Sequence, residues 1–258
     1  MTSALTTRAN PAGWLPVRTP VSDGGANSQV RPGSAAASVC GLPRARTVLA
    51  VTARPGVESA VLGGLLYAFG QAGARLTLLS LTRGEASPYN STSSRLEAVR
   101  PWELQLASWL LGISSVAVAD YPDGGLSHRP TPSLTERIRR AIAEYAPDLI
   151  LVLDPAAGTC DDAQVARAVS LAAGPAGVPV AARTTPGASG SWLVELGAEA
   201  HVAREVQRAA TRAHASQSEA LPGELRSLDG LDGHEHLRWL VHAAIRPPAP
   251  RAAEPCLS

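Results

Sequence analysis

The stretch Val48-Leu-Ala-Val-Thr-Ala-Arg-Pro-Gly-Val-Glu-Ser59 decides the fold. Its first half is apolar, which predicts a buried strand, and Pro55-Gly56 predicts a tight turn that leads into a helix. In α/β proteins, ligand and metal sites are built where a strand passes into the following helix. The residues of this turn are therefore the first candidates for a functional site.

Strand and helix patterns alternate along the chain from residue 47 to residue 244. Strands are expected at 47–51, 75–81, 115–119, 149–153, 178–182 and 192–195, and helices at 58–71, 94–111, 133–145, from 161 or 162 to 173, 201–216 and 235–244. The wholly apolar run Leu149–Leu153 is typical of a parallel strand covered on both faces. Repeated β-α-β units predict an α/β fold with a doubly wound, Rossmann-like parallel sheet. No G-x-G-x-x-G motif follows the first strand, so a dinucleotide is not indicated.

Helix starts are indicated by polar residues in capping positions. Ser94-x-x-Glu97 and Ser133-x-x-Glu136 resemble capping boxes, and Asp161 or Asp162 is expected to cap the next helix. The pair Gly63-Gly64 should let the first helix pack closely on the sheet.

Length and composition predict one domain with two tails. We expect a disordered or loosely ordered tail at 1–45, the α/β domain at 46–246 and a flexible tail at 247–258. The 23 basic residues are all Arg, which excludes lysine catalysis and is typical of a GC-rich bacterial gene. A net charge of +1 favours no nucleic-acid partner. Without an apolar run of about 20 residues or a secretory pattern, we expect a cytoplasmic protein with no membrane association.

Five further motifs follow one another in a specific order. They are Gly63-Gly64, Leu81-Thr82-Arg83-Gly84-Glu85, Arg100-x-x-Glu103 with Ala107 and Leu111-Gly112, Tyr121-Pro-Asp123-Gly124, and His214-Ala-Ser216-Gln217. In this order and spacing they resemble the PIG-L/LmbE family of zinc-dependent N-deacetylases over about residues 47 to 217. The resemblance implies hydrolysis of an N-acetyl amide, usually on glucosamine attached to another group.

The turn after the first strand resembles the A-H-P-D-D-E turn of that family. There the His and the second Asp bind zinc, while the first Asp is the general base that takes a proton from the zinc-bound water. In this chain Arg54 replaces the His, Gly56 replaces the base and Val57 replaces the second Asp. Glu58 persists.

A later family motif, H-P-D-H, supplies the third zinc ligand and a His that stabilises the oxyanion. It falls at Thr159-Cys160-Asp161-Asp162, so Thr159 replaces the oxyanion His and Asp162 replaces the ligand His. Asp161 persists. With all three ligands and the base replaced, we expect no zinc, no other cofactor and no intact catalytic set.

Other residues of the expected pocket keep their polar character. The resemblance implies that Arg100 and Asp123 hold the hydroxyls of a sugar; alternatively, Arg100 and Glu103 are a structural helix pair. We expect Arg54, Glu58, Asp161 and Asp162 to line the pocket.

We interpret the chain as a pseudo-deacetylase that binds an amino-sugar or glycoside-like molecule or serves as a regulatory or assembly protein with a protein partner. The alternative is a repurposed, metal-independent enzyme that uses the same pocket, for example in biosynthesis. An outlying possibility is residual N-deacetylation with unexpected zinc ligands such as His128 or His214.

Four local hypotheses accompany this interpretation. Arg54 and Asp162 form an ion pair across the former metal site, or else are two independent surface residues. A hard-metal site could use carboxylates, namely Asp154, Asp161, Asp162 and Glu58. Cys160 is a packed residue rather than a nucleophile. The segment His234-Glu235-His236 is a solvated helix start rather than a metal site, because residues i and i+2 lie on different faces of a helix.

Overall fold

The computed structural model describes residues 17–18, 41–85, 96–197, 199–218 and 233–242. These residues form one eight-stranded sheet in the order β1-β4-β3-β2-β5-β6-β8-β7. The strands are β1 (Val17–Arg18), β2 (Thr47–Thr52), β3 (Arg75–Thr82), β4 (Ile113–Tyr121), β5 (Leu149–Leu153), β6 (Val180–Arg183), β7 (Ser191–Glu195) and β8 (His234–Val241). The five strands from β4 to β6 run parallel, and β1, β8 and β7 are antiparallel to their neighbours. The predicted doubly wound α/β fold is confirmed.

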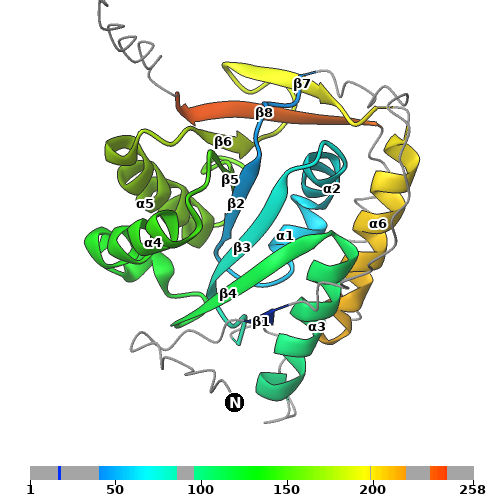
Figure 1. Cartoon of the computed structure of the whole chain (residues 1–258). Helices are drawn as coiled ribbons and strands as arrows, with labels where there is room; N and C mark the ends of the chain where they lie inside the picture. Colours follow the sequence, from blue (N-terminus) through cyan, green and yellow to red (C-terminus); the bar gives the residue numbers. More distant parts are fainter. Residues whose placement is uncertain (1–16, 19–40, 86–95, 198, 219–232, 243–258) are drawn as a thin grey trace, which may run out of the picture.

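Helices cover both faces of the sheet (Figure 1). They are α1 (Val57–Ala60), α2 (Gly63–Gln71), α3 (Leu96–Leu110), the 3₁₀ helix η1 (Leu126–His128), α4 (Thr131–Tyr145), α5 (Cys160–Ala176), α6 (Ala200–Ala213) and α7 (Ala215–Ser218). Leu49 and Val51 of β2 pack in one core with α4 and α5, while Val48 and Ala50 pack in the other with α2, α3 and α6. Alternate residues of β2 therefore serve two cores, as expected of a central parallel strand.

The strand order reverses at β2. From β2 the chain moves to β3 and β4 on one side, and it then crosses to β5 and β6 on the other. In doubly wound sheets, the crevice beyond the carboxyl ends of the strands at such a reversal binds ligands. The turns after β2 and β5 lie at this point, which places the sequence-derived candidates where the topology favours a site.

The glycine pair at the start of α2 accommodates a helix rather than the sheet. A Cβ on Gly63 would lie 2.8 Å from Cγ of Gln207, and one on Gly64 would lie 2.7 Å from Nη1 of Arg204. Both contacts come from α6. The prediction of close packing is correct, but the partner is a helix that approaches from outside the sheet.

The segment predicted as a helix at 235–244 is instead strand β8. Glu235 and Leu237 are buried, while His234, His236 and Arg238 are only partly buried, which is the period of two of a strand. β8 is inserted between β6 and β7. Pairing on both edges thus overrides a weak helical pattern, and the helix prediction is wrong here.

Helix boundaries also differ from the predictions. The helix expected at 58–71 divides into α1 and α2. α4 begins at Thr131, so Ser133 lies inside the first turn and is not the N-cap. Thr159, rather than either aspartate, caps α5. The predicted cap Ser94 lies outside the described residues.

The predicted tails remain predictions. Within 1–45, Val17–Arg18 pairs with β4, and Gly41 accepts a hydrogen bond from the indole of Trp192. In the part of the chain that the structure describes, no helix combines the length and apolarity needed to cross a membrane.

Candidate functional site

The turn after β2 is held together by Glu58. Gly56 adopts φ +96°, a left-handed conformation that favours glycine, and it is the N-cap of α1. Its backbone N–H donates to Oε2 of Glu58 at 2.8 Å. Val57 is buried, and Arg54 is partly exposed. Within this turn, the only carboxylate is therefore that of Glu58, and it binds the backbone of the turn itself.

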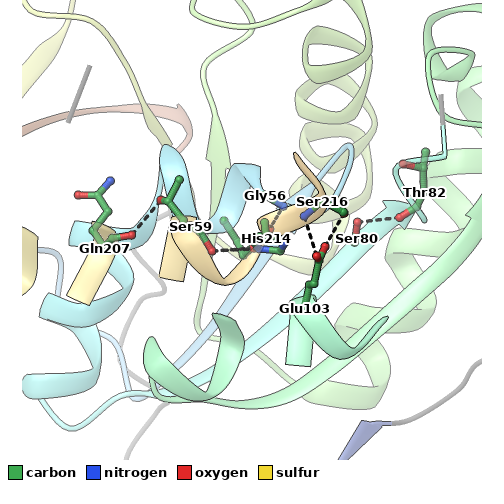
Figure 2. A network of polar contacts seen from close by, with 10 residues as sticks. Gly56, Ser59, Ser80, Thr82, Glu103, Gln207, His214 and Ser216 are labelled. Carbon is green, nitrogen blue, oxygen red and sulfur yellow. Dashed lines mark hydrogen bonds and ion pairs between the residues drawn. The ribbon is translucent and has the colours of Figure 1, made fainter. Parts of the chain in front are cut away.

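The other oxygen of Glu58 meets two buried side chains, those of Ser59 and His214, which are labelled in Figure 2. Nε2 of His214 lies 2.7 Å from Oε1 of Glu58, and the Ser59 hydroxyl donates to the same oxygen at 2.8 Å. Ser59 Oγ is also 3.3 Å from Nε2 of His214. Glu58 and Ser59 are 0% exposed and His214 is 2% exposed. In a catalytic serine triad, the serine and the carboxylate lie at different ring nitrogens of the histidine. Here Ser59 and Glu58 both lie at Nε2 of His214, so the three side chains form a buried structural group.

Burial alone would raise the pKa of Glu58. The charge and hydrogen bond of His214, with the hydrogen bonds from Ser59 and from backbone, outweigh that effect and hold the pKa below its ordinary value of 4.5. Glu58 is thus kept ionised, and it ties the end of α6 to the turn after β2. The structure thus places His214, named above as an unexpected zinc ligand, in a buried contact with Glu58 and Ser59.

Asp162 is engaged in the cap of α5 and not with Arg54. Its Oδ2 accepts from the Thr159 backbone N–H at 2.9 Å and from the Thr159 hydroxyl at 2.7 Å, while the backbone N–H of Asp162 donates to Thr159 Oγ1. Among the described residues, the Asp162 carboxylate contacts Thr159, and no ion pair joins it to Arg54. The predicted ion pair is therefore wrong, because the capping box satisfies this carboxylate within one turn.

Asp161 is also satisfied by backbone. Its two carboxylate oxygens accept from the N–H groups of Leu126 at 3.1 Å and Ser127 at 2.8 Å. These are the first N–H groups of η1, which have no partner within so short a helix. Asp161 consequently joins α5 to the loop after β4.

The proposed hard-metal site is not assembled. Asp154 forms a bidentate ion pair with Arg238 of β8, with Oδ1 2.9 Å from Nη2. Burial raises the pKa of Asp154, but hydrogen bonds from Ala156, Arg238 and Thr184 outweigh it and lower the pKa overall. Within the described ranges, no three His, Cys, Asp or Glu side chains form a metal-binding group.

Across the same edge, beyond β3 and β4, lies a second set of charged side chains, which we term the Arg100 cluster: Arg100, Glu103, Glu85 and Asp123. Arg100 is buried and its burial lowers the pKa of the guanidinium, an effect that the carboxylates of Asp123, Glu103 and Glu85 oppose. The structure thus brings together Arg100 and Asp123, the two predicted sugar-binding residues. Asp123 is only half-buried, so the cluster reaches the surface.

Backbone and hydroxyl contacts fix the loops of this cluster. Thr82 donates through its hydroxyl to Oδ1 of Asp123 at 3.3 Å, and the Asp123 N–H donates to Oε1 of Glu85 at 3.0 Å. Gly84 has φ +74°, and a Cβ there would lie 3.2 Å from Pro55 and 3.4 Å from Nη1 of Arg100. Gly84 therefore lets the Arg100 cluster approach the turn after β2.

Glu103 links the Arg100 cluster to α7. It accepts from the backbone N–H of Ser216 at 2.7 Å and from its hydroxyl at 2.6 Å (Figure 2). The alternative that Glu103 is a structural residue is supported by this contact, although its partner is Ser216 of α7.

Sequence reasoning missed a buried ion cluster on β8. Glu235 is 2% exposed, and its two oxygens lie 2.5 Å from Nη1 of Arg204 and 3.1 Å from Nε of Arg183. The error followed from reading 235–244 as a helix. The alternation from His234 to Val241 was the signal that could have revealed the strand.

The remaining candidates lie at the surface. Cys160 is an exposed free thiol at the first residue of α5, which corrects the expectation that it is packed. His128 is exposed, with Nδ1 3.4 Å from the Ser127 hydroxyl. A hollow of about 370 Å³ lies at the end of β4 against α4. It is lined by Ala119, Asp120, Tyr121, Ser133, Glu136, Arg137 and Arg140, and so does not include the candidate site.

The residues at the family's zinc positions do not fit a zinc ion. A guanidinium at Arg54 repels a cation, and the isopropyl group of Val57 offers no lone pair. Asp162 offers a carboxylate, but its Oδ2 holds the cap of α5. We therefore assign no catalytic step to a metal at these positions.

Comparison with known proteins agrees with the fold. The family model PIG-L, described as GlcNAc-PI de-N-acetylase, matches residues 49–173. A probable N-acetyl-alpha-D-glucosaminyl L-malate deacetylase 2 from Bacillus anthracis is 31% identical over 115 residues, which are 43% of this chain and 51% of that protein. The chain therefore spans about half the length of this curated relative.

Solved structures share the fold at low identity. The conserved protein TT1542 from Thermus thermophilus has a TM-score of 0.62 at 22% identity, covering 80% of this chain and 99% of that one. The N,N'-diacetylchitobiose deacetylase from Pyrococcus horikoshii has a TM-score of 0.60 at 17% identity, covering 76% and 84%. At these identities the likeness concerns the fold alone.

Proposed function

Because this chain belongs to the PIG-L family, we propose that it is a pseudo-deacetylase that binds an amino-sugar-like molecule without zinc-dependent hydrolysis. The binding role is that of a sensor, regulator or assembly component, and the ligand contacts the Arg100 cluster where Asp123 reaches the surface. A chain can have the fold of a deacetylase family without its activity, because the fold does not depend on the few residues of the active site.

One observation carries the proposal: two of the three zinc positions hold side chains that cannot bind a zinc ion. Arg54 and Val57 offer no lone pair to a metal, and at the third position Oδ2 of Asp162 binds Thr159 within the capping box of α5. Gly56 has no side chain that could act as a base. At these positions, an attacking water would therefore have neither a zinc ion to activate it nor a side chain to accept its proton.

The Arg100 cluster supports the binding half of the proposal. Asp123 is half-buried, beside a guanidinium whose charge is partly desolvated. Such carboxylate and guanidinium groups bind vicinal hydroxyls through several directed hydrogen bonds. The curated relative is a probable deacetylase of an N-acetylglucosaminyl compound, and a solved fold relative is a diacetylchitobiose deacetylase. The substrates named for these two proteins support an amino sugar as the ligand class.

Calorimetry and acetate release test both halves of the proposal. The purified chain is titrated with glucosamine and N-acetylglucosamine and their methyl glycosides, once with EDTA and once with one equivalent of zinc. We expect binding that does not depend on zinc, no acetate release, and less than about a tenth of an equivalent of bound metal by elemental mass spectrometry.

Two variants locate the binding. Asp123→Asn should weaken sugar binding about tenfold or more, because a charge-assisted hydrogen bond is lost. The matched control Asp120→Asn removes a carboxylate that pairs with Arg83 at the exposed surface, and it should leave affinity unchanged. Acetate release with about one equivalent of zinc would overturn the proposal. Conversion of a bound sugar without metal would favour the repurposed enzyme instead.

A further inference from the structure

The outer face of α3 is unusually apolar. Val99, Trp102, Leu106 and Trp109 are 40%, 76%, 50% and 63% exposed. We term these four residues the α3 tryptophan face. The opposite side of the helix packs on β4, α6 and α7 and carries Arg100 and Glu103 inward. In Figure 1, α3 lies in the outer layer beside α6.

Charge is missing from this face. Between residues 99 and 110, the exposed side chains are those of the α3 tryptophan face and Pro101, all of them apolar. A single exposed leucine needs no explanation, whereas a continuous apolar stripe marks an interaction surface. The two tryptophans also favour an interaction surface, because tryptophan is enriched among the few residues that contribute most of the binding energy of an interface.

The spacing of the stripe selects a helix as its partner. Positions 99, 102, 106 and 109 follow steps of three, four and three residues, which are the a and d positions of a heptad. Such a seam packs against a similar seam at a small crossing angle. A second α3 supplies a similar seam, and a two-fold axis places the same patch on both copies.

The area suffices for a weak dimer. A fully buried aromatic side chain covers about 150–250 Å², so at their exposed fractions the two tryptophans offer roughly 200–350 Å² per copy. Two copies therefore bury roughly 400–700 Å² from tryptophan alone. With Leu106, Val99 and the rim, the total approaches the value of about 1,000 Å² that specific interfaces reach. A net charge of +1 per chain adds little repulsion.

We propose that two copies of this chain form a two-fold symmetric dimer through the α3 tryptophan face. Helices that bind membrane surfaces carry arginine or lysine around the apolar stripe, and none is exposed on residues 99–110. A second copy is therefore favoured over a lipid surface. Since the same helix carries Arg100 and Glu103 on its inner side, the dimer would hold the Arg100 cluster in place. This inference does not depend on the proposed function.

Sedimentation of the full chain between about 1 and 300 μM tests the proposal. We expect a monomer–dimer equilibrium with a dissociation constant in the micromolar range. The variant Trp102→Glu/Trp109→Glu should raise that constant about 100-fold or more, because it places two charges in the apolar seam and because tryptophan is enriched among the residues whose loss most weakens an interface. Leu171→Glu, at an exposed apolar residue of α5, is the matched control and should sediment as the parent does.

Cross-linking provides a readout that does not depend on charge. In a background with Cys40, Cys160 and Cys256 changed to Ser, Leu106→Cys should form an oxidised dimer, because Leu106 lies at the centre of the seam. Leu171→Cys should not.

Three outcomes would overturn the dimer. One is a monomer at every concentration, and another is a dimer that persists in the double glutamate variant with unchanged thermal unfolding. The third is a monomeric chain that binds phosphatidylcholine or phosphatidylserine vesicles through the tryptophans, which would assign the face to lipid.

Discussion

The two halves of the candidate site differ in what their charged groups do. At the turns after β2 and β5, Glu58, Asp161 and Asp162 each bind a group of the protein itself. Beyond β3 and β4, Asp123 stays half-exposed near the buried Arg100. In the first half the carboxylates bind backbone and side chains of the protein itself, while in the second half a carboxylate remains partly exposed. The comparison teaches that carboxylates at one edge of a sheet can differ in whether the fold itself uses them.

If the charged groups at the turns after β2 and β5 are structural, removing one of their side chains must lower the free energy of unfolding and leave sugar affinity unchanged. The largest effect is expected for His214→Ala, which leaves the fully buried Glu58 without its ion-pair partner. Breaking a buried pair costs about 3–5 kcal/mol. Urea unfolding at pH 7 measures the loss, with the exposed His128→Ala as control.

The pH dependence of that loss sharpens the assignment. In the parent, the pKa of Glu58 lies below 4.5, so its stabilising contribution is complete above about pH 4.5 and is lost as pH falls through the lowered value. Without His214, burial raises the pKa of Glu58, and protonation then favours the folded variant. The stability difference between parent and variant should therefore begin to narrow above pH 4.5, as pH falls through the raised pKa of Glu58 in the variant, and should narrow further below pH 4.5. A difference that stays constant from about pH 7 to pH 4 would contradict the role of the pair.

A smaller loss is expected for Asp161→Ala. It leaves the N–H groups of Leu126 and Ser127 without their acceptor, and hydrogen bonds to a charged group contribute about 1.5–3 kcal/mol. Unfolding should show that loss, and hydrogen exchange should rise at these two amides. Sugar affinity at the Arg100 cluster should stay the same. A large fall in affinity with unchanged stability would place Asp161 in the binding site.

The smallest effects concern Arg54 and Asp162. Asp162→Ala removes half of a capping box, which costs about 1 kcal/mol. Arg54→Ala should change stability by less than about 0.5 kcal/mol, as is usual for surface positions. Since the two side chains form no ion pair, the double variant should be additive within about 0.5 kcal/mol. A coupling well above that value would restore the ion pair that the structure does not show.

Strong local patterns determined most of the fold. The apolar runs of β2 and β5 and the glycine pair of α2 were readable in advance, because parallel central strands and close helix packing tolerate few side-chain types. The wrong assignment at β8 arose where the pattern was weak. There, hydrogen bonding to β6 and β7 decides the structure.

The sequence by itself also determined which chemical groups stand at the family's zinc positions, since Arg54, Gly56 and Val57 are read directly from the chain. Only the tertiary structure decided what the surviving charges do. Glu58 and His214 are 156 residues apart and meet through the packing of α6, whereas Asp162 finds its partner three residues away. Spacing in the sequence cannot rank these contacts, because each carboxylate takes the donors that burial brings within reach.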